Sequence, residues 1–184
     1  MLNRFAILST FCAAVLLASP ALAQTAPDPQ NTILLETKDG TVTIRMRPDL
    51  APNHVARIKT LTKEGFYNGV VFHRVIAGFM AQTGDPTGTG GGGSKLPNLK
   101  AEFSQVPYKR GTVGMARTSA PDTANSQFFI CYDGCGPLTG QYTIIGEVVS
   151  GMDNVDKIKK GAPGSGSVTG PDKIVRMRLQ ADAS

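Results

Sequence analysis

The hydrophobic and polar positions near the start of the chain alternate with a period of two. Residues 41–47 (TVTIRMR) show this alternation. The run before them, residues 31–37 (NTILLET), also reads as a strand, and the turn signal Lys38-Asp39-Gly40 separates the two runs. Successive side chains of a β-strand point to opposite faces, so the alternation predicts half-buried strands. Together the two runs and their turn predict a β-hairpin.

The period changes over residues 49–64, where Val55, Ile58 and Leu61 recur three positions apart. This spacing places the three side chains on one face of an amphipathic α-helix. Pro52 suits the first helical turn, because the N–H that proline lacks would have no helical partner there. We therefore predict a helix over this range.

The rest of the chain is predicted to form mainly strands. The further strand candidates, which alternate with Gly- and Pro-containing segments, are residues 70–76, 79–82, 111–116, 126–131, 143–149 and 175–179, where Val175, Met177 and Leu179 alternate. A second, short helix is predicted at residues 152–159. Many strands with only two helices favour an antiparallel barrel over a sheet of β-α-β units. The predicted fold is mainly β, a closed eight-stranded antiparallel β-barrel capped by two α-helices.

The first 23 residues resemble a cleavable export signal. Arg4 supplies a positive charge, residues 5–18 are mainly apolar, and Ala21-Leu22-Ala23 is a small-residue cleavage pattern. The apolar run is shorter than the roughly 20 residues that a membrane span needs, so we expect no stable membrane anchor. The predicted organisation is a signal peptide at 1–23, a flexible lead-in at 24–30 and one domain at 31–184.

The distribution of charge argues against nucleic acid as a partner. The formal charge of the whole chain is +5, and removal of the leader takes away one basic residue and no acidic one, which leaves +4. Both signs are mixed along the chain, whereas nucleic-acid-binding proteins usually carry a clustered basic stripe. We expect no nucleic-acid partner.

Two cysteines follow the leader, Cys131 and Cys135 in the segment ICYDGCG. An oxidising compartment outside the cytoplasm permits a disulfide between them. Their spacing is not Cys-x-x-Cys, and no second Cys or His pair completes a zinc site. A small loop-closing disulfide and two free thiols both stay open, with the compartment favouring the disulfide. We expect no metal site and no cofactor.

The glycine run Gly88–Gly93 (GTGGGG) formally matches the dinucleotide-binding pattern G-x-G-x-x-G. Such a site also needs a preceding strand and a following helix, whose N-terminal amides bind the pyrophosphate. Here Asp85-Pro86 precedes the run and Ser94-Lys95-Leu96-Pro97 follows it, so no such helix begins. We interpret the run as a flexible loop and not as a nucleotide site.

The chain has little machinery for covalent or acid–base catalysis. Of its two histidines, His54 is expected to be exposed near the start of the first helix, and His73 is expected to be structural. No Gly-x-Ser-x-Gly nucleophile motif is present. An enzyme of this sequence would have to catalyse a reaction that needs neither a nucleophile nor a base.

Three long segments resemble motifs of the cyclophilin family. They are FYNGVVFHRVIAGFMAQTGDPTGTGGGGS (66–94), GTVGMARTSAPDTANSQFFI (111–130) and LTGQYTIIGEVVSGMDNVDKI (138–158). The resemblance runs from about residue 32 to about residue 179, and the MARTS…SQFFI form with the leader is similar to the exported bacterial branch. Cyclophilins are peptidyl-prolyl cis-trans isomerases, so the resemblance implies faster rotation of X–Pro bonds in exported proteins during their folding in the periplasm.

The resemblance implies roles for particular residues of this chain. Arg74 would be the catalytic donor to the prolyl nitrogen, and Gln82 would orient Arg74 and bind the substrate backbone. A guanidinium suits this role because it stays charged and presents a rigid fork of donors. The substrate-binding residues would be Phe79, Met80, Phe129 and Leu138 for the proline ring, Ala116, Arg117 and Gln127 for the residues before proline, and Tyr142.

The chain departs from the family pattern at three positions in or beside this site. Arg117 stands where many eukaryotic members have asparagine, Pro137 lies where a tryptophan often precedes Leu138, and Tyr142 replaces a common histidine. None of these residues supplies the donor to the prolyl nitrogen, so we expect isomerase activity. In the family that tryptophan donates a hydrogen bond to cyclosporin, and this chain has no tryptophan. We therefore expect weak or no cyclosporin binding.

Two classes of function fit an apolar seat for proline: an isomerase, and a proline-peptide binding module or holdase chaperone whose isomerase activity is incidental. A pure binder needs only the seat and backbone contacts, so the presence of Arg74 and Gln82 favours catalysis. The expected partners are proline-containing unfolded or partly folded polypeptides, and we expect a monomer.

Overall fold

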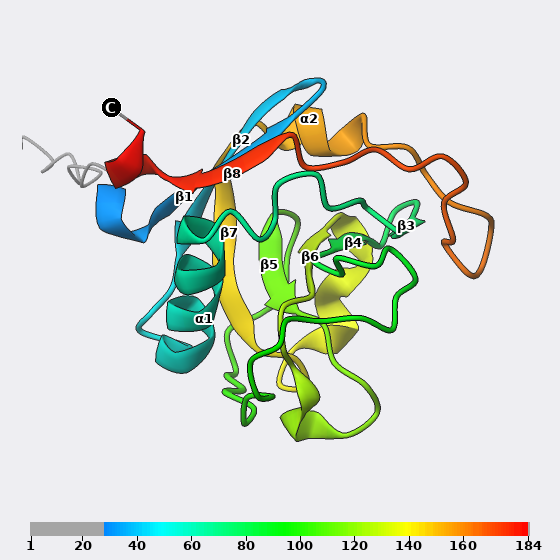
Figure 1. Ribbon diagram of the computed structural model, residues 1–184. Helices are drawn as coiled ribbons and strands as arrows, with labels where there is room; N and C mark the ends of the chain where they lie inside the picture. The colour runs from blue at the N-terminus through cyan, green and yellow to red at the C-terminus, as the bar shows by residue number, and fades with distance from the viewer. Residues whose placement is uncertain (1–27, 184) are drawn as a thin grey trace, which may run out of the picture.

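A single curled antiparallel sheet with two helices beside it forms the described part of the protein (Figure 1). The structure, a computed structural model, describes residues 28–183, so the predicted signal peptide at 1–23 lies outside it. The strands are β1 (Thr32–Thr37), β2 (Gly40–Met46), β3 (Arg74–Ile76), β4 (Met80–Thr83), β5 (Thr112–Met115), β6 (Phe128–Cys131), β7 (Ile144–Ser150) and β8 (Arg176–Leu179). The helices are α1 (Pro52–Lys63) and α2 (Met152–Asp156), with short 3-10 helices η1 (Pro29–Asn31), η2 (Pro121–Thr123), η3 (Asp133–Leu138) and η4 (Gln180–Asp182).

The predicted elements are largely present, with shorter bounds in places. The strand predicted at residues 70–76 contracts to three residues in β3, and the second helix ends at Asp156. The alternating run that was predicted as the final strand began at Val175, whereas β8 begins at Arg176. Val175 lies just before β8 and is 50% exposed, unlike the buried Ile174, Met177 and Leu179.

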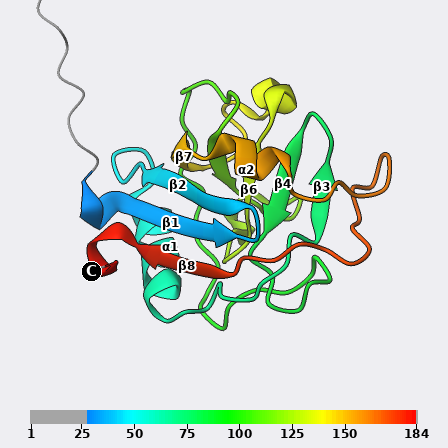
Figure 2. The ribbon, with the colours of Figure 1, turned by 90° about the horizontal axis from the view of Figure 1, so that it is seen from above.

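The sheet is open, so the predicted closed barrel is not confirmed. Its strand order is β3-β4-β6-β5-β7-β2-β1-β8, which leaves β3 and β8 as edges. The two edge regions meet through isolated bridges at Val71–Lys173 and Arg74–Ser167. The irregular segment 160–171 runs beside β3 (Figure 2), and it holds four glycines and two prolines, which disfavour a regular strand. A continuous ladder along β3 is therefore absent from the described residues.

Side chains of the sheet form two hydrophobic clusters. The main core includes the predicted apolar face of α1, whose Val55, Ile58 and Leu61 are buried. Strand β6 is buried on both faces, because Phe128 and Ile130 join the main core whereas Phe129 and Cys131 face the other way. The second, smaller cluster consists of Met80, Tyr108, Phe129, Cys131, Cys135 and Ile144.

The sequence left two states of Cys131 and Cys135 open, a disulfide and two free thiols, and the structure contains the disulfide. Cys131 at the end of β6 and Cys135 in η3 are bonded, with their Cα atoms 5.9 Å apart. Both residues are fully buried in the second cluster. The bond therefore fixes η3 onto the end of β6.

His54 is buried, so the prediction of an exposed side chain was wrong. Its Nδ1 lies 2.6 Å from Oε2 of Glu102, which also accepts the backbone N–H of His54 at 3.0 Å. The other oxygen of Glu102 accepts the backbone N–H of Asn53 at 3.2 Å. A carboxylate at this position satisfies free N–H groups in the first turn of α1. Glu102 is 48 residues from His54, so no local pattern indicated it.

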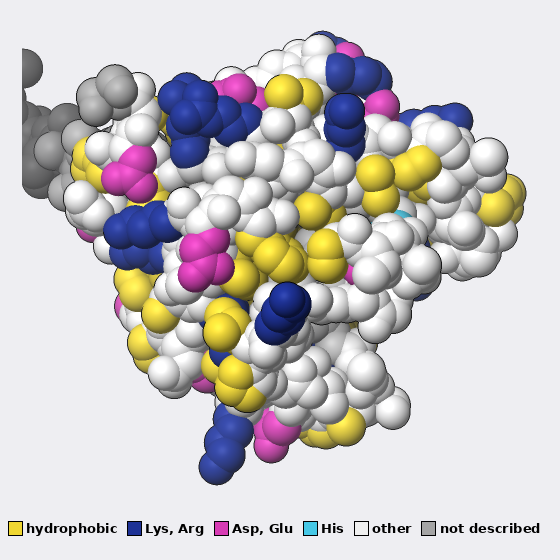
Figure 3. Space-filling view, in the orientation of Figure 1, with side chains coloured by type: hydrophobic (Ala, Val, Ile, Leu, Met, Phe, Trp, Pro, Cys, Tyr) yellow, Lys and Arg dark blue, Asp and Glu magenta, His cyan; other side chains and the backbone are white. Residues whose placement is uncertain are grey.

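The surface carries charges of both signs. On the face shown in Figure 3, Lys and Arg side chains are scattered among Asp and Glu and do not form one block. Within residues 28–183, none of the helices combines the length and apolar character that crossing a membrane requires.

Candidate functional site

Strand register brings Arg74, Gln82 and Phe129 into one row across the sheet. Arg74 of β3 is paired with Gln82 of β4, and Gln82 is paired with Phe129 of β6. The next residue in the row is Gly114 of β5. Directly opposed residues have Cβ atoms roughly 5 Å apart and share a face. A guanidinium, a carboxamide and an aromatic ring therefore lie side by side, although they are up to 55 positions apart in the sequence.

The Phe129 ring occupies space that Gly114 leaves free. A Cβ at position 114 would lie 2.6 Å from Cζ of Phe129 and would also collide with the Tyr108 hydroxyl. Tyr108 stacks on Phe129 with ring centroids 6.0 Å apart, and Tyr142 meets Phe129 edge-on at 5.9 Å. Contacts on two sides, together with the absence of a side chain at Gly114, fix the orientation of this ring.

A cavity of about 160 Å³ opens over this row, and we call it the apolar cavity because most of the residues that line it are apolar or aromatic. It is lined by Arg74, Phe79, Met80, Gln82, Ala116, Arg117, Phe129, Leu138 and Tyr142. The structure thus brings together all of the predicted site residues except Gln127. Met80 and Phe129 are almost fully buried and belong to the second cluster, which lies beneath the cavity. These two residues are therefore both core and cavity lining.

Two hydrogen bonds hold the Arg74 guanidinium at this cavity. Nη1 donates to Oε1 of Gln82 at 3.2 Å, and Nε donates to the carbonyl oxygen of Ser165 at 3.1 Å. Ser165 belongs to the irregular segment that runs beside β3. No carboxylate among residues 28–183 forms a salt bridge with Arg74. The result is an oriented positive charge beside an apolar cavity, without a neutralising partner in the described protein.

Arg117 borders the apolar cavity on another side. Its guanidinium carbon lies 4.4 Å from the centroid of the Tyr142 ring, a cation–π distance. Nη2 and Nε donate to the carbonyl oxygen of Gln141 at 2.9 and 3.3 Å, and Nη1 donates to that of Thr118 at 2.9 Å. Stacking and carbonyl contacts therefore give Arg117 a fixed place in the wall.

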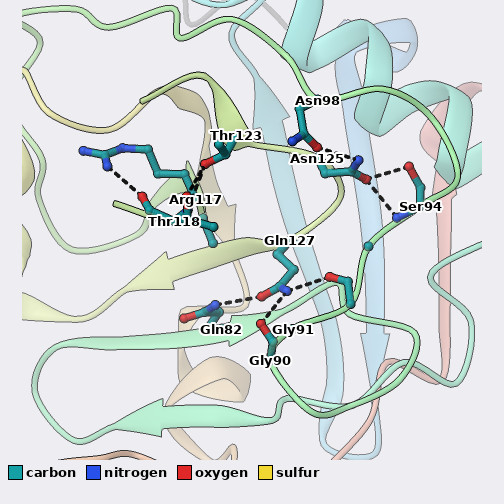
Figure 4. Close-up of a pocket in the computed structure, with 13 residues that line it drawn as sticks. Gln82, Gly90, Gly91, Ser94, Asn98, Arg117, Thr118, Thr123, Asn125 and Gln127 are labelled. Carbon is teal, nitrogen blue, oxygen red and sulfur yellow. Dashed lines mark hydrogen bonds between the residues drawn. The ribbon is translucent and has the colours of Figure 1, made fainter. Parts of the chain in front are cut away.

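A second cavity of about 370 Å³, the glycine-loop cavity, adjoins the first and shares Gln82, Ala116 and Arg117 with it. Gln127, the remaining predicted site residue, lies here (Figure 4). The other lining residues are Gly90, Gly91, Gly92, Gly93, Ser94, Asn98, Thr118, Thr123 and Asn125. The predicted site residues therefore line two adjoining cavities.

Hydrogen bonds tie down the glycine run that the sequence led us to interpret as a flexible loop. Nε2 of Gln127 donates to the carbonyl oxygens of Gly90 at 3.0 Å and Gly92 at 2.8 Å. The amides of the same two glycines donate to Oδ2 of Asp85 at 2.7 and 3.1 Å. Oδ1 of Asp85 accepts the backbone N–H and the hydroxyl of Thr87, both at 2.8 Å. The interpretation as a free loop overlooked this internal anchor.

Asp85 is 1% exposed, and its surroundings favour the ionised form. Burial by itself raises the pKa of a carboxyl, but the hydrogen bonds from Thr87, Gly92 and Gly90 outweigh it and lower the pKa of Asp85 to about 2. Sequence patterns did not single out this residue. The only local signal was a threonine two positions after an aspartate, which is typical of a side-chain-capped turn.

Comparison with known proteins decides the family. The family model described as "Cyclophilin type peptidyl-prolyl cis-trans isomerase/CLD" matches residues 32–179.

The chain belongs to the cyclophilin family. The resemblance predicted from the three motifs is thereby confirmed, including its extent along the chain. Among curated cyclophilin relatives, a Brucella suis protein named "Probable peptidyl-prolyl cis-trans isomerase" is 57% identical over 169 residues, which cover 85% of this chain and 86% of that protein. A Helicobacter pylori peptidyl-prolyl cis-trans isomerase is 44% identical over 131 residues, 69% of this chain and 79% of its own length.

Solved cyclophilin structures share the fold. AquaCyp293 from Hirschia baltica has a TM-score of 0.75 at 29% identity and covers 85% of this chain and 76% of its own. A Cryptosporidium parvum cyclophilin type peptidyl-prolyl cis-trans isomerase, solved in the presence of the dipeptide Ala-Pro, has a TM-score of 0.74 at 28% identity and covers 80% of this chain and 98% of its own. This cyclophilin is thus a peptidyl-prolyl cis-trans isomerase, the activity that the sequence favoured over a pure binding module.

Proposed function

We propose that this cyclophilin isomerises X–Pro bonds of exported polypeptides by a non-covalent mechanism in which Arg74 donates to the prolyl nitrogen. The observation that carries the proposal is the Arg74 guanidinium, which is oriented at the apolar cavity by Gln82 and Ser165 and has no carboxylate partner within residues 28–183. A neutralised or distant arginine could not polarise a bound proline.

The reaction requires the loss of amide resonance and no bond cleavage. Partial double-bond character gives the peptide bond a rotation barrier of about 18–20 kcal/mol. In the twisted transition state the prolyl nitrogen is pyramidal and its lone pair is no longer delocalised into the carbonyl. A donor aimed at this nitrogen binds the twisted form more strongly than either planar isomer, which is the condition for catalysis. Arg74 is therefore assigned to stabilise the developing lone pair.

The size of the required effect is within the range of electrostatic preorganisation. Raising a spontaneous rate of about 0.01 s⁻¹ to about 10³ s⁻¹ requires roughly 7 kcal/mol of transition-state stabilisation. Removal of one preorganised donor from an enzyme site typically costs about 10²–10³ in rate. One charged donor, helped by orientation of the substrate, can supply much of this stabilisation.

The apolar cavity seats the proline ring in this proposal. Phe79, Met80, Phe129 and Leu138 supply its apolar lining. Such a seat binds both isomers, so it orients the substrate but does not by itself accelerate rotation. The Cryptosporidium parvum relative, solved in the presence of Ala-Pro, supports proline-containing peptides as the substrate class.

Residues before the proline are assigned to the glycine-loop cavity. Gln82 would bind the substrate backbone as well as Arg74, and Ala116, Arg117, Gln127 and Tyr142 would line the path of the peptide. The continuity of the two cavities through Gln82, Ala116 and Arg117 supports this assignment.

The compartment is part of the proposal and rests on the sequence of the first 23 residues. The protein would act in the periplasm as a monomer on unfolded or partly folded polypeptides. Intact-mass analysis of the exported protein should give a chain that begins at Gln24, whereas the mass of the full chain would contradict export with cleavage.

The mechanism is tested by Arg74→Ala. We expect the isomerisation rate of an X–Pro tetrapeptide, measured by NMR exchange spectroscopy, to fall about a hundredfold or more. Peptide affinity, measured by chemical-shift titration, should change only a few fold. Arg45→Ala is the matched control. It also removes an arginine, but this arginine forms an exposed ion pair between β2 and β7 with Glu147 and does not line the apolar cavity. Wild-type rates in Arg74→Ala would refute the proposed mechanism, and a joint loss of rate and affinity would favour a binding module.

A further inference from the structure

A continuous chain of hydrogen bonds leads from the buried Asp85 to Arg74. Oδ2 of Asp85 accepts the amides of Gly90 and Gly92, and the carbonyl oxygens of the same glycines accept both N–H groups of the Gln127 carboxamide. Nε2 of Gln82 donates to Oε1 of Gln127 at 2.8 Å. Oε1 of Gln82 then accepts from Nη1 of Arg74. Figure 4 shows the central part of this chain, from the glycine loop through Gln127 to Gln82.

The direction of this chain is fixed at both ends. Carbonyl oxygens can only accept, so the two glycine carbonyls require the NH₂ group of Gln127 to face them. The oxygen of Gln127 must then face Gln82, which in turn must present its own NH₂ group to Gln127 and its oxygen to Arg74. An arginine can only donate, so this is the one orientation of Gln82 that can hold the guanidinium. Reversal of either carboxamide would place oxygen against oxygen or donor against donor.

The loop is shaped to present its two carbonyls in this way. With both amides held by one buried carboxylate oxygen, Gly90 and Gly92 turn their carbonyl oxygens toward Gln127. A Cβ at Gly92 would collide with Oδ1 of Asp85 and lie 2.8 Å from Oγ1 of Thr87, so only glycine fits against the anchor. The glycine run is therefore a backbone acceptor site for Gln127.

We propose that Asp85 is a positioning residue for isomerisation, which acts through the glycine loop, Gln127 and Gln82 to hold the Arg74 guanidinium in its working orientation. Asp85 does not line either cavity and would not touch the substrate. If an NH₂ group stands in place of Oδ2, the glycine amides face a donor instead of an acceptor, so the two carbonyls are released and the carboxamides become free to reverse. The inference rests on the proposed function, because it assigns Asp85 a part in placing the proposed donor.

The test is a double-mutant cycle between Asp85→Asn and Gln127→Met. Methionine has a shape similar to that of glutamine but cannot form the hydrogen bonds, so it disconnects the loop from Gln82. We expect Asp85→Asn alone to lower kcat about tenfold, which corresponds to about 1.4 kcal/mol, with peptide affinity changed less than about twofold. In the Gln127→Met background, Asp85→Asn should have no further effect on kcat, because the connection is already broken. Equal effects in both backgrounds would overturn the proposal.

A spectroscopic readout without substrate separates positioning from general destabilisation. The ¹⁵N–¹H resonance of Arg74 Nε should shift in Asp85→Asn and in Gln127→Met, in the absence of peptide and at a temperature where each variant is folded. Glu102→Gln is the matched control. It also neutralises a carboxylate that accepts several hydrogen bonds, but Glu102 is not part of the hydrogen-bond path from Asp85 to Arg74. Its Arg74 resonance and its kcat should match those of the wild type.

These outcomes separate the inference from the proposed function. If Arg74→Ala lowers the isomerisation rate while Asp85→Asn leaves kcat and the Arg74 resonance unchanged, only the positioning role of Asp85 is contradicted. Should Asp85→Asn not fold, Gln127→Met decides, because an unshifted Arg74 resonance in that variant contradicts the connection. If Arg74→Ala isomerises at the wild-type rate, the mechanism fails first, whatever the Asp85 variants do.

Discussion

The buried carboxylate of Asp85 should make the stability of this cyclophilin depend on acid in a defined range. Its pKa is lowered from the ordinary 3.8 to about 2 in the folded protein. A carboxyl with a lower pKa in the folded state contributes stability above its unfolded pKa, and this contribution is lost as the pH falls through the folded pKa. For Asp85 the range is therefore between pH 3.8 and about pH 2.

The magnitude follows from the two pKa values. Their difference, at about 1.36 kcal/mol per pH unit, corresponds to about 2 kcal/mol of folding free energy at neutral pH. Roughly half of this contribution should remain at pH 3, where the folded carboxyl is still mostly ionised and the unfolded one is mostly protonated. Because the residue is 1% exposed, little of the effect should be screened by salt.

The assay is urea unfolding of the wild type and Asp85→Asn at pH 7 and pH 3, followed by far-ultraviolet circular dichroism. At pH 7 the variant should be less stable than the wild type by at least about 2 kcal/mol. It loses the charge of Asp85, and the NH₂ group of the new asparagine also faces N–H or O–H donors of the loop. At pH 3 the difference between the two proteins should shrink by about 1 kcal/mol. A difference that is the same at both pH values would refute the argument, because it would mean that Asp85 titrates alike in the folded and unfolded chains.

Three further predictions concern the apolar cavity and its supports. Gly114→Ala should displace the Phe129 ring and weaken the binding of a proline peptide, measured by titration, about tenfold or more. In the control variant Gly136→Ala, the added Cβ meets nothing within 4 Å, so this variant should bind the peptide like the wild type. Equal affinities of the two variants would contradict the packing argument. Replacement of Cys131 and Cys135 by serine should lower the free energy of unfolding by about 2 kcal/mol, the value for closure of a short loop, and an unchanged urea midpoint would contradict it. Cyclosporin should bind weakly or not at all in calorimetry, since the chain has no tryptophan, and a tight complex would show that the indole is dispensable.

The local pattern was enough for much of the fold. Two strand-like runs separated by a turn signal located β1 and β2, and the three-residue spacing of Val55, Ile58 and Leu61 located α1 and its buried face. These signals are reliable because they depend only on which side chains of one element face the core. The motif resemblance added the family and identified Arg74 and Gln82 as candidate catalytic residues.

Local sequence patterns could not predict whether the barrel closes or what surrounds His54. Whether β3 and β8 join depends on the path of an irregular segment far along the chain, and its glycines and prolines keep it from forming a ladder. His54 is buried because Glu102 reaches it from a distant loop. Both predictions were made from residues that are neighbours in sequence. The closure of the sheet and the burial of His54 depend instead on segments that are distant in sequence and close in space.

The sequence by itself determined most of the elements, the family and a set of candidate site residues. Only the tertiary structure decided how these residues are arranged: the register that aligns Arg74, Gln82 and Phe129, and the hydrogen-bond path from Asp85 through the glycine loop. The physical reason is that hydrogen bonds and cross-strand contacts are directional and short, so they depend on where distant segments meet. Alternation and spacing report only the direction in which each side chain leaves its own backbone.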